Sequence, residues 1–242
     1  MLSVICPIYN EAKYIEVCIQ SILLQDFPKD DLEVLFIDGM SKDSTRDIVK
    51  EYTKMYPFIK LVDNPKKIVP IAMNIGIRAA KGDIIMRLDA HANYPTNYFS
   101  TLVRQLINLR ADNVGVACRT DVLNKTSKTL AIREVLSNRF GIGNSTFRLG
   151  VADVMEVETV PFGCWRRDVF DKYGYYDERL IRNQDIELNK RIGHGGGKIY
   201  IVPDAYCTYL ARETFGALAR NNYGNGKWNV LTVYYTKQMD SR

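Results

Sequence analysis

The chain has 242 residues, 46% of them hydrophobic, and a net charge of +5 from 33 Lys and Arg against 28 Asp and Glu. This length suits one α/β domain with a substantial core, or one domain plus an appendage. The basic residues are scattered, which argues against a nucleic-acid partner and leaves an acidic ligand or an anionic membrane surface compatible. No apolar run approaches the roughly 20 residues needed to span a bilayer.

Five widely spaced cysteines, in an odd number and without a CxxC pair, favour a reducing compartment over a disulfide framework or a structural zinc site. The first residues lack the basic stretch and the long apolar stretch of a signal peptide. We therefore expect a cytoplasmic location.

Strands and helices alternate along the first half of the chain. Apolar runs predict five buried strands, over 2–8, 32–37, 59–62, 83–88 and 114–118. Apolar residues at helical spacing predict four helices, over 15–23, 43–56, 70–80 and 98–109, the second of them capped by Asp43. This alternation predicts an α/β fold with a mostly parallel sheet and helices on both faces.

The second half of the chain is less regular. We expect helices over 127–138 and 167–172, strands over 154–160 and 198–202, a turn at 161–165, and a helix with Asp185 in its first turn. From residue 213 the pattern predicts another helix, followed by the glycine-containing segment 221–228.

Polar segments follow three of the predicted strands, at residues 9–11, 38–41 and 89–91. Ligands of mostly parallel sheets bind beyond the carboxyl ends of the strands. The three segments should therefore line one crevice, and this convergence is the main reason to expect a functional site.

The third of these segments is Asp89-Ala90-His91. Alternation along an extended chain points Asp89 and His91 the same way. A carboxylate and an imidazole so placed can hold a divalent cation that completes its shell with water and phosphate oxygens. The alternative is that Asp89 caps a turn and His91 is a surface residue.

Several segments, in the right order from residue 2 to about 205, resemble the family 2 glycosyltransferases with the GT-A fold. VICPIYNEAKYIEVCIQSIL resembles their opening strand, loop and helix, and DGMSKDST at 38–45 resembles their second motif, from which Gly39 and Met40 depart. Residues 72–83 resemble the third motif, and Asp89-Ala90-His91 occupies the Asp-x-Asp position. Gln184-Asp185 occupies the Glu-Asp position of the catalytic base. These variants look most like the branch that builds bacterial exopolysaccharides of the succinoglycan type.

The resemblance implies that residues 1–210 form a GT-A catalytic domain, with a nucleotide-binding half at 1–118 and an acceptor-binding half at 119–210. Residues 211–242 would be a helical extension, after which members of that branch often carry membrane helices. The implied activity is the inverting, metal-dependent transfer of a hexose from a UDP-sugar to a glycan or lipid-linked acceptor. The implied place is the inner face of the cell membrane, in polysaccharide synthesis.

The resemblance also implies roles for single residues. Asp185 is expected to be the catalytic base, and its place in the first turn of a helix favours the ionised form. Asp89 and His91 are expected to hold the metal, and the imidazole favours Mn²⁺ over Mg²⁺. The donor nucleotide is expected to contact Asp89 and a set of residues from the first three motifs: Pro7, Tyr9, Glu11, Asp38, Ser41 and Asn74.

Other interpretations stay open on the sequence alone. A nucleotidyltransferase would normally show a Gly-rich phosphate loop at residues 9–11, and a nicotinamide dehydrogenase would need Gly-x-Gly-x-x-Gly there. A nucleotide-sugar or glycan-binding module without catalysis is compatible with the departures from the motifs. Core packing competes with ligand contact for Tyr9, and with an acceptor platform for Phe162 and Trp165.

Overall fold

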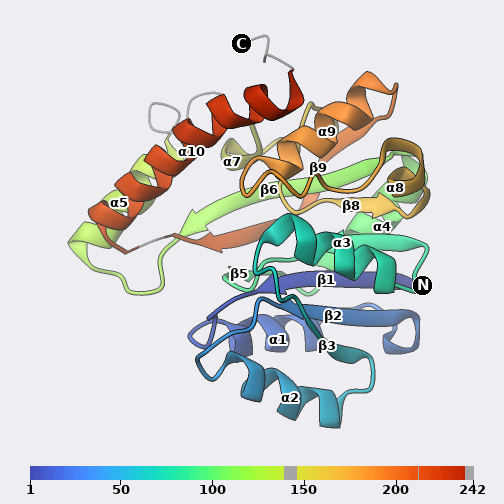
Figure 1. Cartoon of the computed structure of the whole chain (residues 1–242), viewed down its shortest axis with the longest axis horizontal. Helices are drawn as coiled ribbons and strands as arrows, with labels where there is room; N and C mark the ends of the chain where they lie inside the picture. Colours follow the sequence, from blue (N-terminus) through green and yellow to red (C-terminus); the bar gives the residue numbers. More distant parts are fainter. Residues whose placement is uncertain (139–145, 212, 238–242) are drawn as a thin grey trace.

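The computed structural model describes residues 1–138, 146–211 and 213–237, which include one mixed sheet in the order β3-β2-β1-β4-β8-β6-β9-β5, with β7 paired to β9 (Figure 1). The strands are β1 (Leu2–Ile8), β2 (Leu32–Asp38), β3 (Ile59–Asp63), β4 (Ile84–Arg87), β5 (Ala92–Asn93), β6 (Asn113–Asp121), β7 (Met155–Glu156), β8 (Cys164–Arg166) and β9 (Ile199–Leu210). The α-helices are α1 (Ile15–Leu23), α2 (Thr45–Met55), α3 (Val69–Ala79), α4 (Tyr98–Asn108), α5 (Ser127–Ser137), α7 (Thr146–Leu149), α8 (Asp168–Tyr173), α9 (Gln184–His194) and α10 (Phe215–Thr236).

The sheet separates two hydrophobic cores because strand residues alternate between its faces. In β1, Val4 and Cys6 face one core and Ile5 faces the other. Helices α1, α2 and α4 pack on the first face, and α3, α8 and α9 pack on the second. The predicted architecture, a mostly parallel sheet with helices on both faces, is confirmed: β1, β2, β3 and β4 pair in parallel, as do β6 and β9.

The prediction of a turn at 161–165 is wrong for its last two residues. Cys164 and Trp165 belong to β8, which lies between β4 and β6 and pairs antiparallel with both. The buried Asn113 of β6 fixes this strand, because its Oδ1 accepts a hydrogen bond from the Cys164 amide at 3.1 Å. Trp165 of β8 is 2% exposed, and Phe162 just before the strand is also buried. Both aromatic residues therefore belong to the core of the described structure.

Other boundaries also differ from the predictions. The strand predicted at 154–160 is reduced to β7, whereas β9 runs on to Leu210. Helix α2 begins at Thr45 rather than at Asp43, whose carboxylate accepts from the amides of Thr45 (3.1 Å) and Ala12 (3.1 Å) and so bridges two loops.

The largest difference is α10, which continues as one 22-residue helix through the glycine-containing segment at 221–228. It begins at the N-cap Thr214, whose hydroxyl accepts from the Ala217 amide at 3.2 Å. None of its residues is fully buried. Within the described ranges, neither α10 nor any other helix has the length and apolar character required to cross a membrane.

Candidate active site

The carboxyl ends of β1, β2 and β4 lie side by side because these strands are parallel neighbours. Hydrogen bonds join the first two of the loops that follow. The Asn10 amide donates to Ser41 Oγ at 2.9 Å, the Lys42 amide to Asn10 Oδ1 at 2.8 Å, and the Glu11 amide to Thr45 Oγ1 at 2.8 Å. The structure thus brings together two of the three predicted polar segments.

A non-glycine residue in the left-handed region lies in each of three site loops: Asn10 (φ 56°), Met40 (φ 60°) and Asn183 (φ 60°). Such residues cost on the order of 1–3 kcal/mol each and cluster at functional sites. Met40 is also one of the two departures from the second motif. This departure therefore places a side chain at a position whose backbone favours glycine.

The Asp38 carboxylate is fully buried at the end of β2. It accepts from the Ser41 amide at 3.0 Å, from Ser41 Oγ at 2.5 Å and from Arg46 Nη1 at 2.5 Å. Arg46 also binds Asp63 at 2.8 Å, and its hydrogen bonds to these two carboxylates raise the pKa of the guanidinium. Asp38 and Ser41 thus hold the loop in shape, and their contact with a nucleotide stays a prediction.

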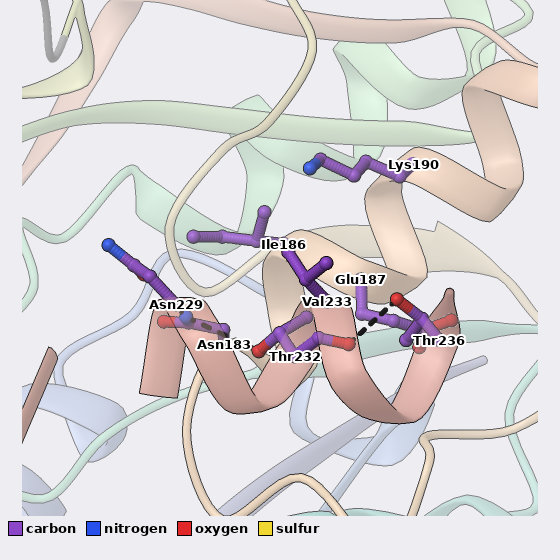
Figure 2. Close-up of a pocket in the computed structure, with 8 residues that line it drawn as sticks. All are labelled: Asn183, Ile186, Glu187, Lys190, Asn229, Thr232, Val233 and Thr236. Carbon is purple, nitrogen blue, oxygen red and sulfur yellow. Dashed lines mark hydrogen bonds between the residues drawn. The ribbon is translucent and has the colours of Figure 1, made fainter. Parts of the chain in front are cut away.

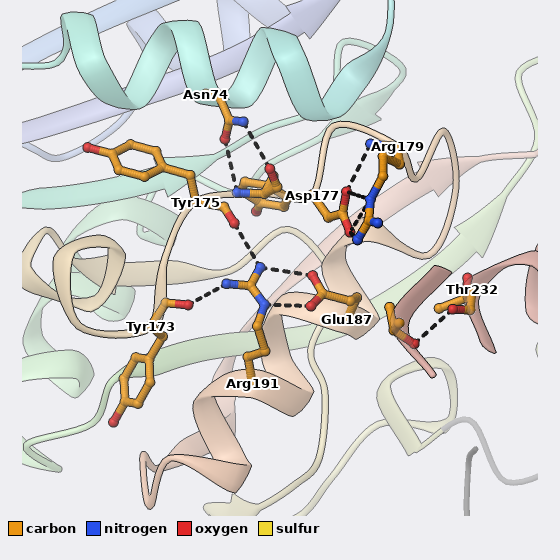
Figure 3. Close-up of polar contacts among 10 residues, drawn as sticks. Asn74, Tyr173, Tyr175, Asp177, Arg179, Glu187, Arg191 and Thr232 are labelled. Carbon is orange, nitrogen blue, oxygen red and sulfur yellow. Dashed lines mark hydrogen bonds and ion pairs between the residues drawn. The ribbon is translucent and has the colours of Figure 1, made fainter. Parts of the chain in front are cut away.

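The other predicted donor residues differ in accessibility. Tyr9 is exposed, so its ring is accessible to a ligand. One side of the ring packs on Gly39, where an added Cβ would lie 3.1 Å from it. Pro7 is half-buried within β1. Asn74 is buried, and its side-chain amide binds the backbone of Tyr176: Oδ1 accepts from the Tyr176 amide at 3.0 Å, and Nδ2 donates to the Tyr176 carbonyl at 3.0 Å (Figure 3). Nδ2 also donates to Glu178 Oε1 at 2.9 Å. The donor role of Asn74 stays a prediction.

Asp89 is held by a buried arginine that the sequence analysis missed. Arg87, the last residue of β4, is 7% exposed. It forms an ion pair with Asp89, in which Nε donates to Oδ1 at 3.0 Å and Nη2 donates to Oδ2 at 3.4 Å. Within the described residues, Arg87 Nη1 is buried without a hydrogen-bond partner. The available signal was a charged residue at the end of the apolar run IIMR, since buried arginines are rare unless paired.

His91 faces the loop after β1. Its Nδ1 lies 3.3 Å from Glu11 Oε1, and its ring meets Tyr209 edge-on, with centroids 5.4 Å apart. The contact joins the third predicted polar segment to the first. The Leu210 amide also donates to the His91 carbonyl at 3.1 Å, which ties this turn to β9.

Across the described residues, no group of three or more His, Cys, Asp or Glu side chains is placed to hold a metal ion. The candidate donor set is one carboxylate, Asp89, and one imidazole, His91. This set fits a divalent ion as part of its shell, because oxygen and imidazole nitrogen both suit Mn²⁺. Water and diphosphate oxygens would have to complete the coordination.

Asp185 is the second residue of α9, and its Oδ1 accepts from the Ile186 amide at 2.9 Å. Burial lowers the pKa of Arg87, but the charges of Asp89 and Asp185 and the hydroxyl of Tyr176 outweigh it and raise the pKa above its ordinary value. Arg87 is thus within electrostatic reach of both predicted site carboxylates. Of these two carboxylates, Asp89 forms the ion pair with Arg87.

Contacts of Arg191, in the last turn of α9, tie this helix to the segment at 173–175 (Figure 3). Arg191 donates to the Tyr173 carbonyl, to the Tyr175 carbonyl at 2.7 Å and to Glu187 Oε1 at 2.5 Å. Its donors are therefore spent on backbone and on its own helix. These contacts hold the helix that carries Asp185.

The layered sheet and its strand-end site define the GT-A class of glycosyltransferase folds. Staphylococcus aureus TarS residues 1–349 with UDP-GlcNAc superposes with a TM-score of 0.69, at 20% identity over 88% of this chain and 59% of that one. The mannosyltransferase PcManGT from Pyrobaculum calidifontis, with GDP-Man and Mn²⁺, gives 0.67 at 21% identity, over 88% and 58%. The chain thus spans less than two thirds of these structures.

The chain belongs to glycosyl transferase family 2, which its sequence matches over residues 3–174. It is 30% identical to the succinoglycan biosynthesis protein ExoA of Rhizobium meliloti, over 93% of this chain and 67% of that protein. It is 28% identical to a dolichyl N-acetyl-α-D-glucosaminyl phosphate 3-β-D-2,3-diacetamido-2,3-dideoxy-β-D-glucuronosyltransferase of Methanococcus voltae, over 97% and 75%. These matches confirm the resemblance seen in the motifs.

Proposed function

We propose that this chain transfers a hexose, with inversion, from a UDP-sugar to a glycan or lipid-linked acceptor in polysaccharide synthesis. The observation that carries the proposal is the meeting of the loops after β1, β2 and β4, which are joined by the Asn10–Ser41 and His91–Glu11 contacts. Relatives and neighbours add support, because they include a succinoglycan biosynthesis protein, an enzyme named for a dolichyl phosphate acceptor, and a structure with UDP-GlcNAc.

In the proposed reaction, the acceptor hydroxyl attacks the anomeric carbon of the donor sugar and gives its proton to Asp185. The bond to the diphosphate breaks as the new glycosidic bond forms, and UDP leaves with the electron pair. Attack from the opposite face inverts the anomeric centre, so an α-linked donor gives a β-linked product. Asp185 is half-buried and its Oδ2 is not used by the bond to Ile186, which leaves an oxygen for the proton.

On the donor side, Asp89 and His91 would hold a divalent metal, with Mn²⁺ favoured over Mg²⁺ because one ligand is an imidazole. When bound, such an ion supplies positive charge for the leaving diphosphate. Glu11 lies beside His91 and would orient its ring, as carboxylates do for metal-bound histidines. Tyr9 would lie against the uracil base and Asp38 would position it, with Pro7, Ser41 and Asn74 shaping the pocket.

We also propose a membrane-surface location. The exposed side chains of α10 include Phe215, Tyr223, Val230 and Tyr234, with the basic Arg220 nearby. Aromatic and apolar groups beside basic ones suit the interface of an anionic bilayer. Sedimentation with phosphatidylglycerol vesicles, compared with phosphatidylcholine vesicles, tests this location, and equal recovery in both supernatants would remove it.

The decisive experiment is a thermal unfolding series with UDP, GDP, dTDP and CDP, each with and without Mn²⁺, followed by hydrolysis assays with UDP-hexoses. A ligand of the native state raises the melting temperature by mass action. We expect a Mn²⁺-dependent shift for UDP alone, and UDP release from at least one UDP-hexose. No shift and no hydrolysis with any nucleotide would point instead to a glycan-binding module without catalysis.

A further inference from the structure

A hollow of about 510 Å³ lies between residues 181–186 and α10. Asp185 lines it together with Arg182 from the same segment and with Asn225 and Asn229 from α10. Ligand pockets commonly have volumes of about 300–1,000 Å³. Carboxamides and a guanidinium beside the proposed base suit a ligand rich in oxygen atoms.

Polar contacts build this hollow, among them one between Asn183 and Asn229, two residues that also line a smaller pocket of the described structure (Figure 2). Arg182 Nη1 donates to Asn221 Oδ1 at 2.9 Å and to Asn225 Oδ1 at 2.7 Å. Asn183 Nδ2 donates to Asn229 Oδ1 at 2.8 Å. Since α10 fully buries none of its residues, these amides form a hydrophilic wall that faces the start of α9.

Arg182 forms no ion pair within the described residues. Its hydrogen-bond acceptors there are two neutral amides. By contrast, Arg179 pairs with Asp177 at 2.6 Å and Arg191 pairs with Glu187 at 2.5 Å. Arg182 is thus a half-buried cation, held in place by amides and without an ion pair among the described residues, three positions before Asp185.

The glycine at 224 lets α10 approach this cation. An added Cβ on Gly224 would lie 3.2 Å from Arg182 Cζ, whereas a Cβ on Gly226 would meet nothing within 4 Å. A glycine inside a helix costs about 1 kcal/mol relative to alanine. The close approach gives a physical reason for glycine at 224.

We propose that the hollow is the acceptor subsite and that Arg182 binds an anionic group of the acceptor, a phosphate or a carboxylate. This inference rests on the proposed function, since Asp185 is the base that would meet the acceptor hydroxyl. A guanidinium recognises phosphate and carboxylate oxygens through paired hydrogen bonds. Asn225 and Asn229 bind hydroxyls of the same saccharide.

Calorimetric binding in saturating UDP tests the subsite without requiring turnover. Three soluble probes carry the same hexyl chain: an N-acetylglucosaminyl phosphodiester, the uncharged N-acetylglucosaminide and a glucuronide. We expect wild type to bind a charged probe more tightly than the uncharged one. Preference for the phosphodiester identifies the phosphate of a lipid linkage, and preference for the glucuronide identifies a sugar carboxylate.

The variant Arg182→Gln should bind the preferred charged probe about tenfold more weakly, because a charge-assisted hydrogen bond is lost. Its affinity for the uncharged probe should change little. Arg220→Gln removes an exposed charge from α10, the helix that Arg182 contacts, and serves as the control. A uniform loss for all three probes would mean that Arg182 only braces α10, and would overturn the proposal.

A second pair of variants separates recognition from folding. Gly224→Ala and Gly226→Ala both raise the helix propensity of α10, but only the first crowds the Arg182 guanidinium. We expect weaker binding of the charged probe in Gly224→Ala alone, with a melting temperature no lower than that of wild type. Equal affinities in the two variants would contradict the assigned role of Arg182.

The failure of this inference differs from the failure of the proposed function. If wild type binds UDP and hydrolyses a UDP-hexose yet does not distinguish the probes, the acceptor assignment is wrong and the donor chemistry stands. If UDP neither binds nor is released from any donor, the proposed function fails. Probe binding that depends on Arg182 would then still support an anionic saccharide site.

Discussion

The loops at the ends of β1, β2 and β4 are built differently from the contact between α9 and α10. In the loops, buried or half-buried charges are paired and backbone amides are bonded to side chains, as at Asp38 and Asp89. Between the helices, the contacts join carboxamides and one guanidinium on a helix that fully buries none of its residues. The strand-end loops are therefore held by buried, paired groups, whereas the contact with α10 is made by groups at the surface of the molecule.

Because of this difference, we expect substitutions in the two regions to affect folding stability and ligand binding to different extents. A change in the strand-end loops disturbs groups that are already desolvated, so it alters folding and ligand binding together. A change on α10 alters groups that water can replace, so it should affect ligand binding more than folding. The following substitutions test the comparison.

The largest effect is expected for Asp185→Asn. The amide can still accept the hydrogen bond from Ile186, but it cannot take a proton, so transfer should fall by about 10²–10⁴-fold. Single-turnover transfer at saturating donor measures this loss, and UDP affinity should be retained. Asp168→Asn, at an exposed position on α8, is the control. Turnover equal to wild type would refute the base assignment.

Asp89→Asn should cause the largest loss of folding stability. It leaves the buried Arg87 guanidinium without its charge partner, and breaking such a pair typically costs about 3 kcal/mol or more. Urea denaturation measures the change in unfolding free energy.

The double variant Arg87→Met with Asp89→Asn should recover much of that stability, because no unpaired charge remains buried. Arg182→Gln, on the other side of the comparison, should unfold near the wild-type midpoint. The contrast between the two regions fails if Asp89→Asn and Arg182→Gln destabilise the protein equally.

A smaller effect is expected for His91→Ala. Loss of a metal ligand should lower transfer and raise the Mn²⁺ concentration needed for half-maximal activity by about tenfold or more. A Mn²⁺ titration of the transfer rate measures the shift. The sequence has one other histidine, His194, which is exposed, and His194→Ala is the control. Wild-type turnover at unchanged metal would remove His91 from the site.

The smallest effect is expected for Met40→Gly, which relieves the left-handed conformation after β2. Stability should rise by about 1 kcal/mol, since glycine adopts this conformation without steric cost. Met55→Gly, at the last residue of α2, places glycine in a helical conformation and should destabilise. If both variants lose stability in chemical denaturation, Met40 is held by packing rather than strained.

The meeting of the strand-end loops could be predicted from the sequence. Asp38, Asp89 and His91 each follow an apolar run, and parallel neighbours bring the ends of such runs to one edge. The β8 strand could not be predicted, because three residues carry too little periodicity and their partners lie in β4 and β6. The course of α10 was missed because Gly224 and Gly226 lower helix propensity locally, whereas contacts to Arg182 and Asn183 support the helix from outside.

By itself, the sequence determined the alternation of strands and helices, the two-sided burial of the strands and the family. These properties follow from residue types at short spacing. Only the tertiary structure decided that the loops after β1 and β4 meet at the contact of Glu11 with His91, and that α10 lies beside Asp185. Those relations join residues tens of positions apart, so they depend on how the layers pack. They also depend on which buried charges form pairs. Neither the packing nor the pairing can be deduced from the spacing of residues along the chain.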